Sequence, residues 1–310
     1  MTSKLLVAGV LALDDLKTPH KSEKGIVGGA GIYSSISSSI FTDTALVAAI
    51  GNDFPKKIME KIDNHKINTQ SVKTLDYPTF HWSGEYTGDM SQAITHETDF
   101  QINDHYDWEI SSEQKKSKLV LLCNNDPNIQ SKIIKQIDSR LIAMDTMNLW
   151  IDIAKEKLEE VVKQVDLLFI NDAEAQLYSG ENNLDEAGKK LLSKGPKYVI
   201  IKRGEHGSSL YSSKITKHLS AFKVSKFVDP TGAGDSFAGA AMGYLSEVDD
   251  INEESLIVAM NYGSAVASIT VEGFGTESIM NVEKKEVEKR FSSLSGCLLY
   301  TSDAADEEDS

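Results

Sequence analysis

Short runs of apolar residues alternate along most of the chain with segments whose apolar positions recur at helical spacing. Runs that are apolar throughout are typical of strands buried on both faces of a parallel sheet. The alternation predicts an α/β fold with a mostly parallel central sheet covered by helices. The predicted strands are Lys4–Val10, Thr44–Ile50, Lys118–Cys123, Leu141–Asp145, Val165–Ile170, Tyr198–Lys202, Ser208–Ser212 and Ala221–Val228. The predicted helices are Ile32–Ile40, Pro55–His65, Asn128–Ile137, Ile151–Val162, Ala173–Tyr178, Leu184–Leu192, Phe237–Leu245, Glu253–Val271 and Val282–Leu294.

Residues 71–104 interrupt this alternation. Phe80, Trp82 and Tyr86 alternate with polar residues, which is the period-two pattern of a strand with one aromatic face. Together with residues 14–27 and further strand-like residues near Ile94 and Phe100, they predict a small β-sheet inserted into the α/β body. An ordinary edge hairpin would show this pattern, and so would a lid that covers a substrate and excludes water.

Residues 1–295 contain no internal repeat and no linker, so one domain that carries the small sheet is the simplest organisation. Residues 296–310 contain no Lys or Arg and have no amphipathic period, which predicts an acidic disordered tail. Residues 297–307 also resemble translated sequencing-adapter read-through, and we assign the tail no role.

Composition narrows the class of protein. The 310 residues carry a formal net charge of −15 without a basic patch, so nucleic acid and acidic membranes are poor partners. The two cysteines, Cys123 and Cys297, offer neither a disulfide framework nor metal-site spacing. The chain opens on a strand-like run instead of a signal peptide, and no apolar run approaches transmembrane length. We therefore expect a cytoplasmic protein.

The segment Asp229–Phe237 joins a strand-like run to a helix of small residues. Gly232 and Gly234 leave backbone N–H groups unshielded, and the following helix adds the positive end of its dipole, so this turn is predicted to bind a phosphate. Asp235 stands at the helix start. A carboxylate there suits the acceptance of a proton from a hydroxyl that attacks a phosphoryl group. A glycine-rich turn capped by Asp would show the same residues, so the segment alone does not decide between the two interpretations.

Polar residues follow several of the predicted strands. Ligands of open α/β sheets collect at the carboxyl ends of the strands, so these residues are predicted to share one edge. The set comprises Asp14, Asp15, Asn124, Asn125, Asp145, Asn148, Asn171, Glu174 and the loop Gly204–Gly207. Each one alone is a common cap or turn residue, whereas their joint occurrence favours a ligand site.

With these motifs the chain resembles the ribokinase/PfkB family of carbohydrate kinases from Lys4 to Leu294. The resemblance implies a ribokinase-like three-layer αβα sandwich in which the inserted sheet is a lid. The matching segments are Asp229–Ala240 (the C-terminal signature), Gly28-Gly29 (the N-terminal glycine pair), Asn171-Asp172-Ala173-Glu174 (N-x-x-E) and Lys202–Gly207 (a strand and G-x-x-G loop). Asp145–Trp150 is similar to a D-x-N stretch of the family but is one residue longer between Asp and Asn.

The resemblance also implies roles in catalysis and substrate binding. Asp235 would be the general base, and the N–H groups of Gly232, Ala233 and Gly234 would form an anion hole for the transferred phosphoryl group. The expected substrate contacts are Asp14 (with Asp15 as the alternative), Gly28, Gly29, Tyr33 and Asn124.

ATP and cations are the implied cofactors. Glu174, with Asn171, would place Mg²⁺ through water. Carbonyls near Asp229 and Thr231 would hold a monovalent cation such as K⁺. The residues expected to bind the nucleotide are Asn171, Lys202, Gly204, Gly207 and Asn261.

One position departs from the family pattern. Four residues after the second glycine of the pair, members often have an Asn that contacts the sugar, and here the residue is Tyr33. A phenol cannot reproduce the paired donor and acceptor of a carboxamide. This weighs against ribose itself and admits a larger or more apolar substrate, including a nucleoside, on which Phe80 and Trp82 would also stack; lid packing explains Trp82 equally well.

We expect an ATP- and Mg²⁺-dependent kinase of a sugar or nucleoside hydroxyl, primary in type, acting as a monomer or as a lid-mediated homodimer. A Rossmann oxidoreductase would need G-x-G-x-x-G after the first strand, and a P-loop NTPase would need G-x-x-x-x-G-K-[S/T]; the chain has neither. The remaining alternative is a non-catalytic sugar- or nucleotide-binding or regulatory protein on the same fold. It is disfavoured because Asp235, Asn171 and Glu174 are all present.

Overall fold

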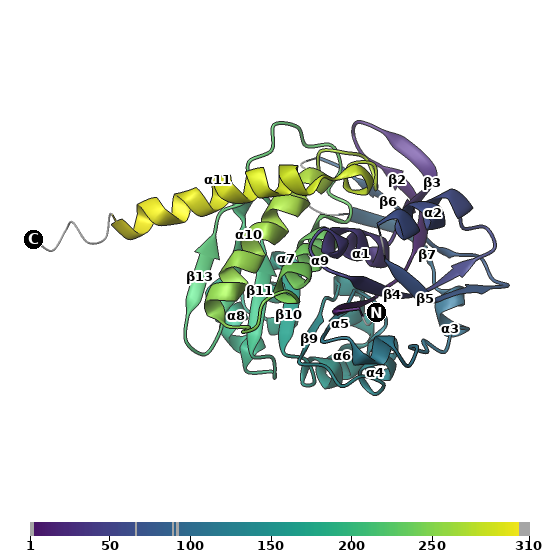
Figure 1. The fold of residues 1–310 in the computed structure, drawn as a ribbon, viewed down its shortest axis with the longest axis horizontal. Helices are drawn as coiled ribbons and strands as arrows, with labels where there is room; N and C mark the ends of the chain where they lie inside the picture. Colours follow the sequence, from purple (N-terminus) through teal and green to yellow (C-terminus); the bar gives the residue numbers. More distant parts are fainter. Residues whose placement is uncertain (1–2, 66, 89, 91–92, 304–310) are drawn as a thin grey trace, which may run out of the picture.

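The computed structural model of the protein describes residues 3–65, 67–88, 90 and 93–303, with the side chains of residues 297–303 left undescribed. Its large sheet has nine strands in the order β13-β12-β11-β10-β9-β8-β1-β4-β5 (Figure 1). Neighbours from β11 to β5 pair in parallel, and β12 and β13 extend the sheet antiparallel. The strands are β1 (Leu5–Ala8), β4 (Thr44–Gly51), β5 (Asn68–Leu75), β8 (Leu119–Leu122), β9 (Leu141–Met144), β10 (Leu167–Asn171), β11 (Tyr198–Lys202), β12 (Ser208–Tyr211) and β13 (Thr216–Leu219).

Helices cover both faces of this sheet, which confirms the predicted α/β sandwich. Successive side chains of a strand point to opposite faces, so Leu5 and Val7 pack with α1, α9 and α10, whereas Leu6 and Ala8 pack with α4, α6 and α8. The helices are α1 (Ala30–Ser39), α2 (Lys56–Asn64), α3 (Gln101–Asp104), α4 (Pro127–Ile134), α5 (Asn148–Ile153), α6 (Lys155–Val162), α7 (Asp172–Ser179), α8 (Leu184–Leu192), α9 (Ala233–Leu245), α10 (Glu253–Thr270) and α11 (Lys284–Asp303).

Helices α1 and α9 approach each other closely because the facing positions are small. A Cβ at Gly239 would collide with the backbone of Ser34, and a Cβ at Gly243 would lie 2.8 Å from the carbonyl oxygen of Ser38. The serines of α1 and the glycines of α9 therefore fix the amino-terminal end of α9 against α1.

The inserted sheet has the strand order β3-β2-β6-β7. Its strands are β2 (Ala12–Lys17), β3 (Ser22–Gly28), β6 (Phe80–Tyr86) and β7 (Ala93–Asp99). Because β2 and β6 pair in parallel, Asp14 and Trp82 share the face that contains the buried Asp14 carboxyl. The opposite face carries ion pairs, among them Lys17–Glu85 at 2.9 Å. Figure 1 places this sheet at the side of the molecule away from the end of α11.

Residues 100–104 were predicted in the small sheet but form the N-cap and body of α3, and the predicted helix Ile151–Val162 is broken at Ala154 between α5 and α6.

Three further segments differ from the sequence predictions. Residues 71–75 belong to β5 at the edge of the large sheet, where Val72 pairs with Ala48, and not to the small sheet. Ala221–Val228 is not a strand: its backbone runs beside α10, with the Phe222 N–H donating to Ser264 Oγ at 3.2 Å, and β13 takes the sheet edge instead.

The last difference concerns the expected disordered tail. Helix α11 continues to Asp303. No proline interrupts residues 296–303, and their only acidic residue is Asp303, at the end of the helix. The rest of the predicted tail, residues 304–310, lies outside the described residues.

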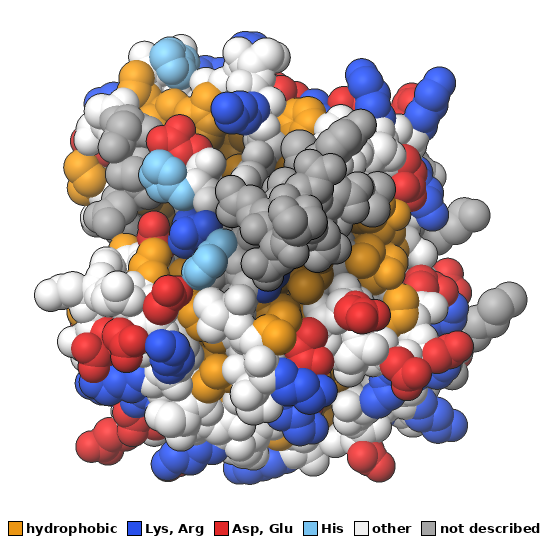
Figure 2. Space-filling view, turned by 90° about the vertical axis from the view of Figure 1, so that its left-hand side faces the viewer, with side chains coloured by type: hydrophobic (Ala, Val, Ile, Leu, Met, Phe, Trp, Pro, Cys, Tyr) orange, Lys and Arg blue, Asp and Glu red, His pale blue; other side chains and the backbone are white. Residues whose placement is uncertain are grey.

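The surface shows acidic and basic side chains interspersed with apolar ones on the face of Figure 2. None of the helices in the described part of the chain is both long and apolar enough to span a bilayer.

Candidate active site

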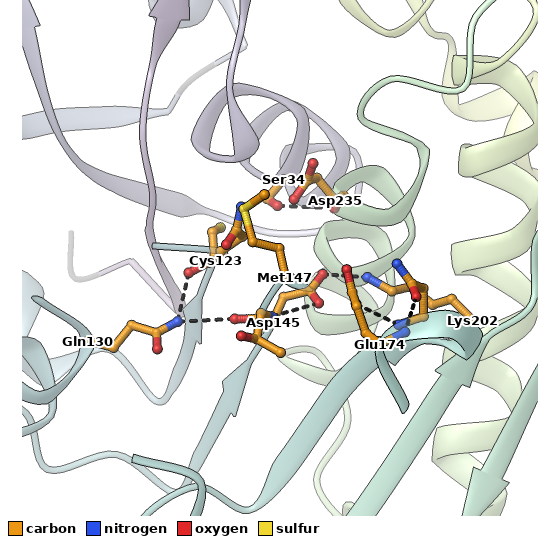
Figure 3. Close-up of polar contacts among 11 residues, drawn as sticks. Ser34, Cys123, Gln130, Asp145, Met147, Glu174, Lys202 and Asp235 are labelled. Atoms are coloured by element: carbon orange, nitrogen blue, oxygen red, sulfur yellow. Dashed lines mark hydrogen bonds and ion pairs between the residues drawn. The ribbon is translucent and has the colours of Figure 1, made fainter. Parts of the chain in front are cut away.

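The carboxyl ends of β9, β10 and β11 meet the amino-terminal end of α9 at one edge of the large sheet, as the strand-end residues predicted. Figure 3 shows Asp145, Glu174 and Lys202 gathered there, with Asp235 above them in this view. Edges of this kind are where open α/β sheets bind ligands.

The turn Gly232–Gly234, called the anion turn below, begins α9. Gly232 has a left-handed φ of 74° and is the N-cap of the helix. A Cβ there would collide with the ring of Tyr33, which packs directly on the turn. Glycine is therefore required at this position by both the backbone and the packing.

Asp235 lies in the first turn of α9. Its carbonyl oxygen accepts a hydrogen bond from Ser34 Oγ at 3.0 Å, which ties the start of the helix to α1. Burial, together with the charge of Asp145 and against the opposing charge of Lys202, raises the pKa of the Asp235 carboxyl to about 6. A base with a pKa near the working pH can both accept and release a proton readily.

Asp14 projects from β2 and is 4 % exposed. Its carboxyl rests on Gly28, where a Cβ would collide with it. Among the residues the structure describes, Oδ1 has no hydrogen-bond partner. Burial, together with the charges of Asp229 and Asp15, raises the pKa of Asp14 to about 8. A hydroxyl group of a bound ligand would give this unpaired buried oxygen a hydrogen-bond partner.

Asp15, the alternative in the sequence prediction, points the other way. Its Oδ1 accepts from the Gly25 N–H at 2.9 Å, and Oδ2 lies 3.4 Å from the ammonium of Lys24 on the charged face of the small sheet.

Two tyrosines stand between Asp14 and the anion turn. Tyr33 is 1 % exposed, and its hydroxyl is unpartnered within the described ranges. Burial, and then the charges of Asp229, Asp14 and Asp235, raise the pKa of Tyr33 well above its ordinary value. Burial, with the charges of the same three carboxyls, also raises the pKa of Tyr86, on strand β6 of the small sheet, to about 12. The small sheet thus contributes a side chain to the site.

Glu174 and Asn171 form a reciprocal cap at the start of α7. Asn171 Oδ1 accepts from the Glu174 N–H at 2.8 Å, and Glu174 Oε2 accepts from the Asn171 N–H at 3.0 Å. Burial raises the pKa of Glu174 to about 7, while Lys202 lowers it. Among the described residues, no three or more His, Cys, Asp or Glu side chains are arranged to bind a metal ion directly. Carboxylate oxygen, as on Glu174, is still the hard ligand type that suits a Mg²⁺ ion bound through water beside phosphates.

The ion pair between Lys202 and Asp145 was not predicted. Lys202 ends β11, and its Nζ bonds to Asp145 Oδ2, with side chains 14 % and 5 % exposed. The two residues are 57 positions apart, so only their place at neighbouring strand ends could have suggested the pairing. Gln130 Nε2 donates to the carbonyl oxygen of Asp145 at 3.1 Å and fixes that strand end.

The predicted nucleotide loop has two glycines with positive φ, a conformation that residues with a side chain rarely adopt. Gly204 has φ 53° and Gly207 has φ 91°, and a Cβ at Gly207 would collide with the backbone of Leu219 on β13. Asn261 is buried on α10, 3 % exposed. Gly204 and Gly207 lie in the loop between β11, which ends at Lys202, and β12.

Both polar atoms of the Asn124 side chain contact other side chains of the protein. Its Oδ1 accepts from Trp150 Nε1 at 3.0 Å, and its Nδ2 lies 3.0 Å from Met147 Sδ. Trp150 continues an aromatic chain to the small sheet, because Phe100 lies 5.6 Å from Trp150 and 5.4 Å from Phe80 between ring centroids. This chain, Phe80–Phe100–Trp150, connects the small sheet to the body.

The side chain of Asp229 stabilises the loop before the anion turn. Oδ1 accepts from the Thr231 N–H at 2.9 Å and Oδ2 from the Gly275 N–H at 2.8 Å. The carboxylate thus aligns the backbone whose carbonyls were predicted to bind a monovalent cation.

A three-layer sandwich with a small sheet over its carboxyl edge, and a partly buried acid beside an anion turn, defines the ribokinase-like class of α/β proteins. Residues 12–283 match the family model of the pfkB family carbohydrate kinases, and the chain belongs to this family. The predicted family is confirmed, and with it the expectation of a carbohydrate or nucleoside kinase.

Individual relatives agree with the assignment. A cytidine kinase of Thermococcus kodakarensis is 27% identical over 254 residues, covering 80% of this chain and 91% of the relative. A solved ribokinase of Thermotoga maritima has a TM-score of 0.74 at 25% identity, covering 94% of this chain and 99% of its own. A putative ribokinase II of E. coli, solved with ATP and Mg²⁺, has a TM-score of 0.76 at 19% identity, with coverage of 94% and 99%.

Proposed function

We propose that the chain transfers the γ-phosphoryl group of ATP to a primary hydroxyl of a sugar or nucleoside, with Asp235 as the general base. The observation that carries this proposal is the position of Asp235: a partly buried carboxyl whose pKa is raised to about 6, in the first turn of the helix that begins at the anion turn.

The acceptor is proposed to bind between Asp14 and the anion turn. Asp14 and the backbone of Gly28 and Gly29 contact its hydroxyls, and Tyr33 and Asn124 border it. The unpaired Asp14 Oδ1 and Tyr33 hydroxyl support this placement, because a hydroxylated ligand would give both a partner.

In the transfer step, Asp235 accepts the proton of the acceptor hydroxyl as that oxygen bonds to the γ-phosphorus. The bond from the γ-phosphorus to the β–γ bridging oxygen breaks, and ADP leaves with the electron pair. The N–H groups of Gly232, Ala233 and Gly234 stabilise the charge on the transferred group.

The nucleotide is proposed to lie over Asn171, Lys202, Gly204, Gly207 and Asn261. Glu174, with Asn171, would hold Mg²⁺ through water, and the ion would supply positive charge that neutralises the phosphates. Carbonyls near Asp229 and Thr231 would hold K⁺ behind the anion turn.

A coupled ADP-release screen over sugars and nucleosides, with and without Mg²⁺, tests the activity. Asp235→Asn should lower kcat by about 10²- to 10⁴-fold, the usual contribution of a general base, while ATP binding persists. Glu254→Gln is the matched control, because Glu254 also lies in the first turn of a helix, α10, but is exposed. Full activity of Asp235→Asn would refute the mechanism, and no turnover with any acceptor would favour a non-catalytic binding protein.

A further inference from the structure

The ammonium of Lys202 lies between a carboxylate and the anion turn. On one side it bonds to Asp145 Oδ2. On the other side, a Cβ added to Gly234 would lie 3.0 Å from Nζ. Both side chains of the pair are almost fully buried, so the ammonium is held in place and is not a solvated surface charge.

This arrangement is incomplete as it stands. The anion turn offers N–H donors, and an ammonium offers only donors, so the two present like partial charges to each other. An anion placed between them would accept from both. The anion turn and Lys202 therefore have the geometry of two halves of one anion site. Without a bound anion, the ammonium bonds to the Asp145 carboxylate instead.

The neighbouring carboxyls identify which anion fits. Asp145 and Glu174 gather around Lys202, with Asp235 above them in the view of Figure 3. Glu174 lies on the proposed Mg²⁺ side and Asp235 on the acceptor side. The group that lies between a metal bound to phosphates and the base is the one being transferred.

We propose that Lys202 is a ligand of the γ-phosphoryl group and that Asp145 is a positioning residue, which holds the ammonium beside the anion turn and gives it up when a triphosphate binds. The inference rests on the proposed function insofar as ATP occupies this edge. With a diphosphate bound, the γ-position is empty and Lys202 stays on Asp145.

The test compares a triphosphate with a diphosphate. The probes are the non-hydrolysable β,γ-imido analogue of ATP and ADP, each with Mg²⁺, titrated calorimetrically without an acceptor. The double variant Asp145→Asn/Lys202→Met removes both charges, so no lone buried carboxylate is left to unfold the protein. Losing one hydrogen bond to a charged group should weaken the triphosphate analogue by about 10- to 100-fold, while ADP stays within about threefold of wild type.

Equal weakening of both ligands, or no weakening of the triphosphate analogue, would overturn the proposal. Lys197→Met is the matched control: Lys197 precedes the same strand, pairs with Asp166 at 2.8 Å and is exposed at the opposite end. It should leave both affinities unchanged.

Asp145→Asn alone separates a positioning role from a structural one. Removing the competing carboxylate frees the ammonium, so the triphosphate analogue should bind several-fold tighter relative to ADP even though the melting temperature falls. A residue that only supports the fold would weaken both ligands together, and that outcome contradicts the role assigned to Asp145. Because no acceptor is present, failure of the wild type to phosphorylate any substrate would refute the proposed function without altering these binding results.

Discussion

Burial raises the pKa of Asp235 to about 6, with Asp145 adding to the rise and Lys202 opposing it. The carboxyl must be ionised to accept a proton, so kcat/KM should increase with pH through about 6 and level off above it. Initial rates between pH 5 and 8, with activity recovered on return to neutral pH as the control for unfolding, give the profile. A profile that is flat across this range would show that another group limits the reaction.

Asp14 links the binding role to stability. Its pKa is about 8 in the folded protein against an ordinary value of 3.8. Between these values the folded state retains a proton that the unfolded chain has lost, so the free energy of unfolding decreases as pH rises, by at most about 1.4 kcal/mol per pH unit.

Asp14→Asn should therefore stabilise the protein at pH 8 and much less at pH 5, because an amide carries no buried charge. The same change should raise the KM of the acceptor. Thermal unfolding at both pH values measures the difference, and an equal shift at both would contradict the assignment. Asp15→Asn is the control: the pKa of Asp15 is lowered by the Gly25 N–H, His81 and Lys24, so this variant should not gain stability at pH 8.

At this scale the sequence predicted residues that belong to local motifs and missed those defined by distant partners. The sequence located Asp235 at a helix start and Asn171 with Glu174 in a cap, because their neighbours in the chain supply the turn and the cap; their roles in catalysis and binding stay predictions. The pairing of Lys202 with Asp145, and the contact of Tyr33 with Gly232, arise only when separate strands and helices are brought together.

Among the helices and turns, the start of α9 is constrained by both backbone conformation and packing. Gly232→Ala would place a Cβ against the Tyr33 ring in a left-handed backbone conformation. The backbone alone costs about 1 kcal/mol, and the collision adds to it by displacing Tyr33 or the anion turn. We expect kcat to fall at least about tenfold, together with a lower melting temperature, measured by the coupled assay and by calorimetry.

Gly180→Ala supplies the matched control for this prediction. Gly180 has φ 76° at the end of α7, and a Cβ there would meet nothing within 4 Å. It should show the backbone penalty alone, with unchanged kcat. If both variants change kcat and the melting temperature equally, the contact between Tyr33 and the anion turn does not contribute to activity.

The strands show why element prediction failed where it did. The buried strands β1, β8 and β10 are apolar throughout and were found. Edge strand β5 is half-polar and was assigned to the small sheet, and β13 was missed for the same reason. Ala221–Val228 has strand-like residues but packs beside α10. The periodicity of a segment does not indicate which neighbouring element it will contact.

For the molecule as a whole, truncations within the C-terminal helix α11 would show where the folded domain ends. Phe291 stacks on Tyr262 with ring centroids 3.9 Å apart, joining α11 to α10. Truncation after Ser295 keeps this stack and should leave kcat/KM unchanged and the melting temperature within about 2 °C, since less than about 1 kcal/mol is lost.

Truncation after Arg290 removes Phe291 and should cost about 1–3 kcal/mol in the free energy of unfolding, the combined worth of the buried ring and the aromatic pair. Chemical denaturation of both truncations measures this. A large loss already in the longer truncation would show that residues 296–310 contribute to the fold, against the expectation from their composition.

The aromatic chain Phe80–Phe100–Trp150 gives the protein an intrinsic optical signal. Trp150 stands where the small sheet meets the body, with its indole N–H on Asn124, whereas Trp108 is fully buried and its emission should stay constant. A movement of the small sheet on binding would change the surroundings of the Trp150 indole and shift its fluorescence. Such a movement could be followed in real time without an attached dye in a Trp82→Phe background, which removes the partly exposed tryptophan of β6. In that background, Trp150→Phe would remove the response.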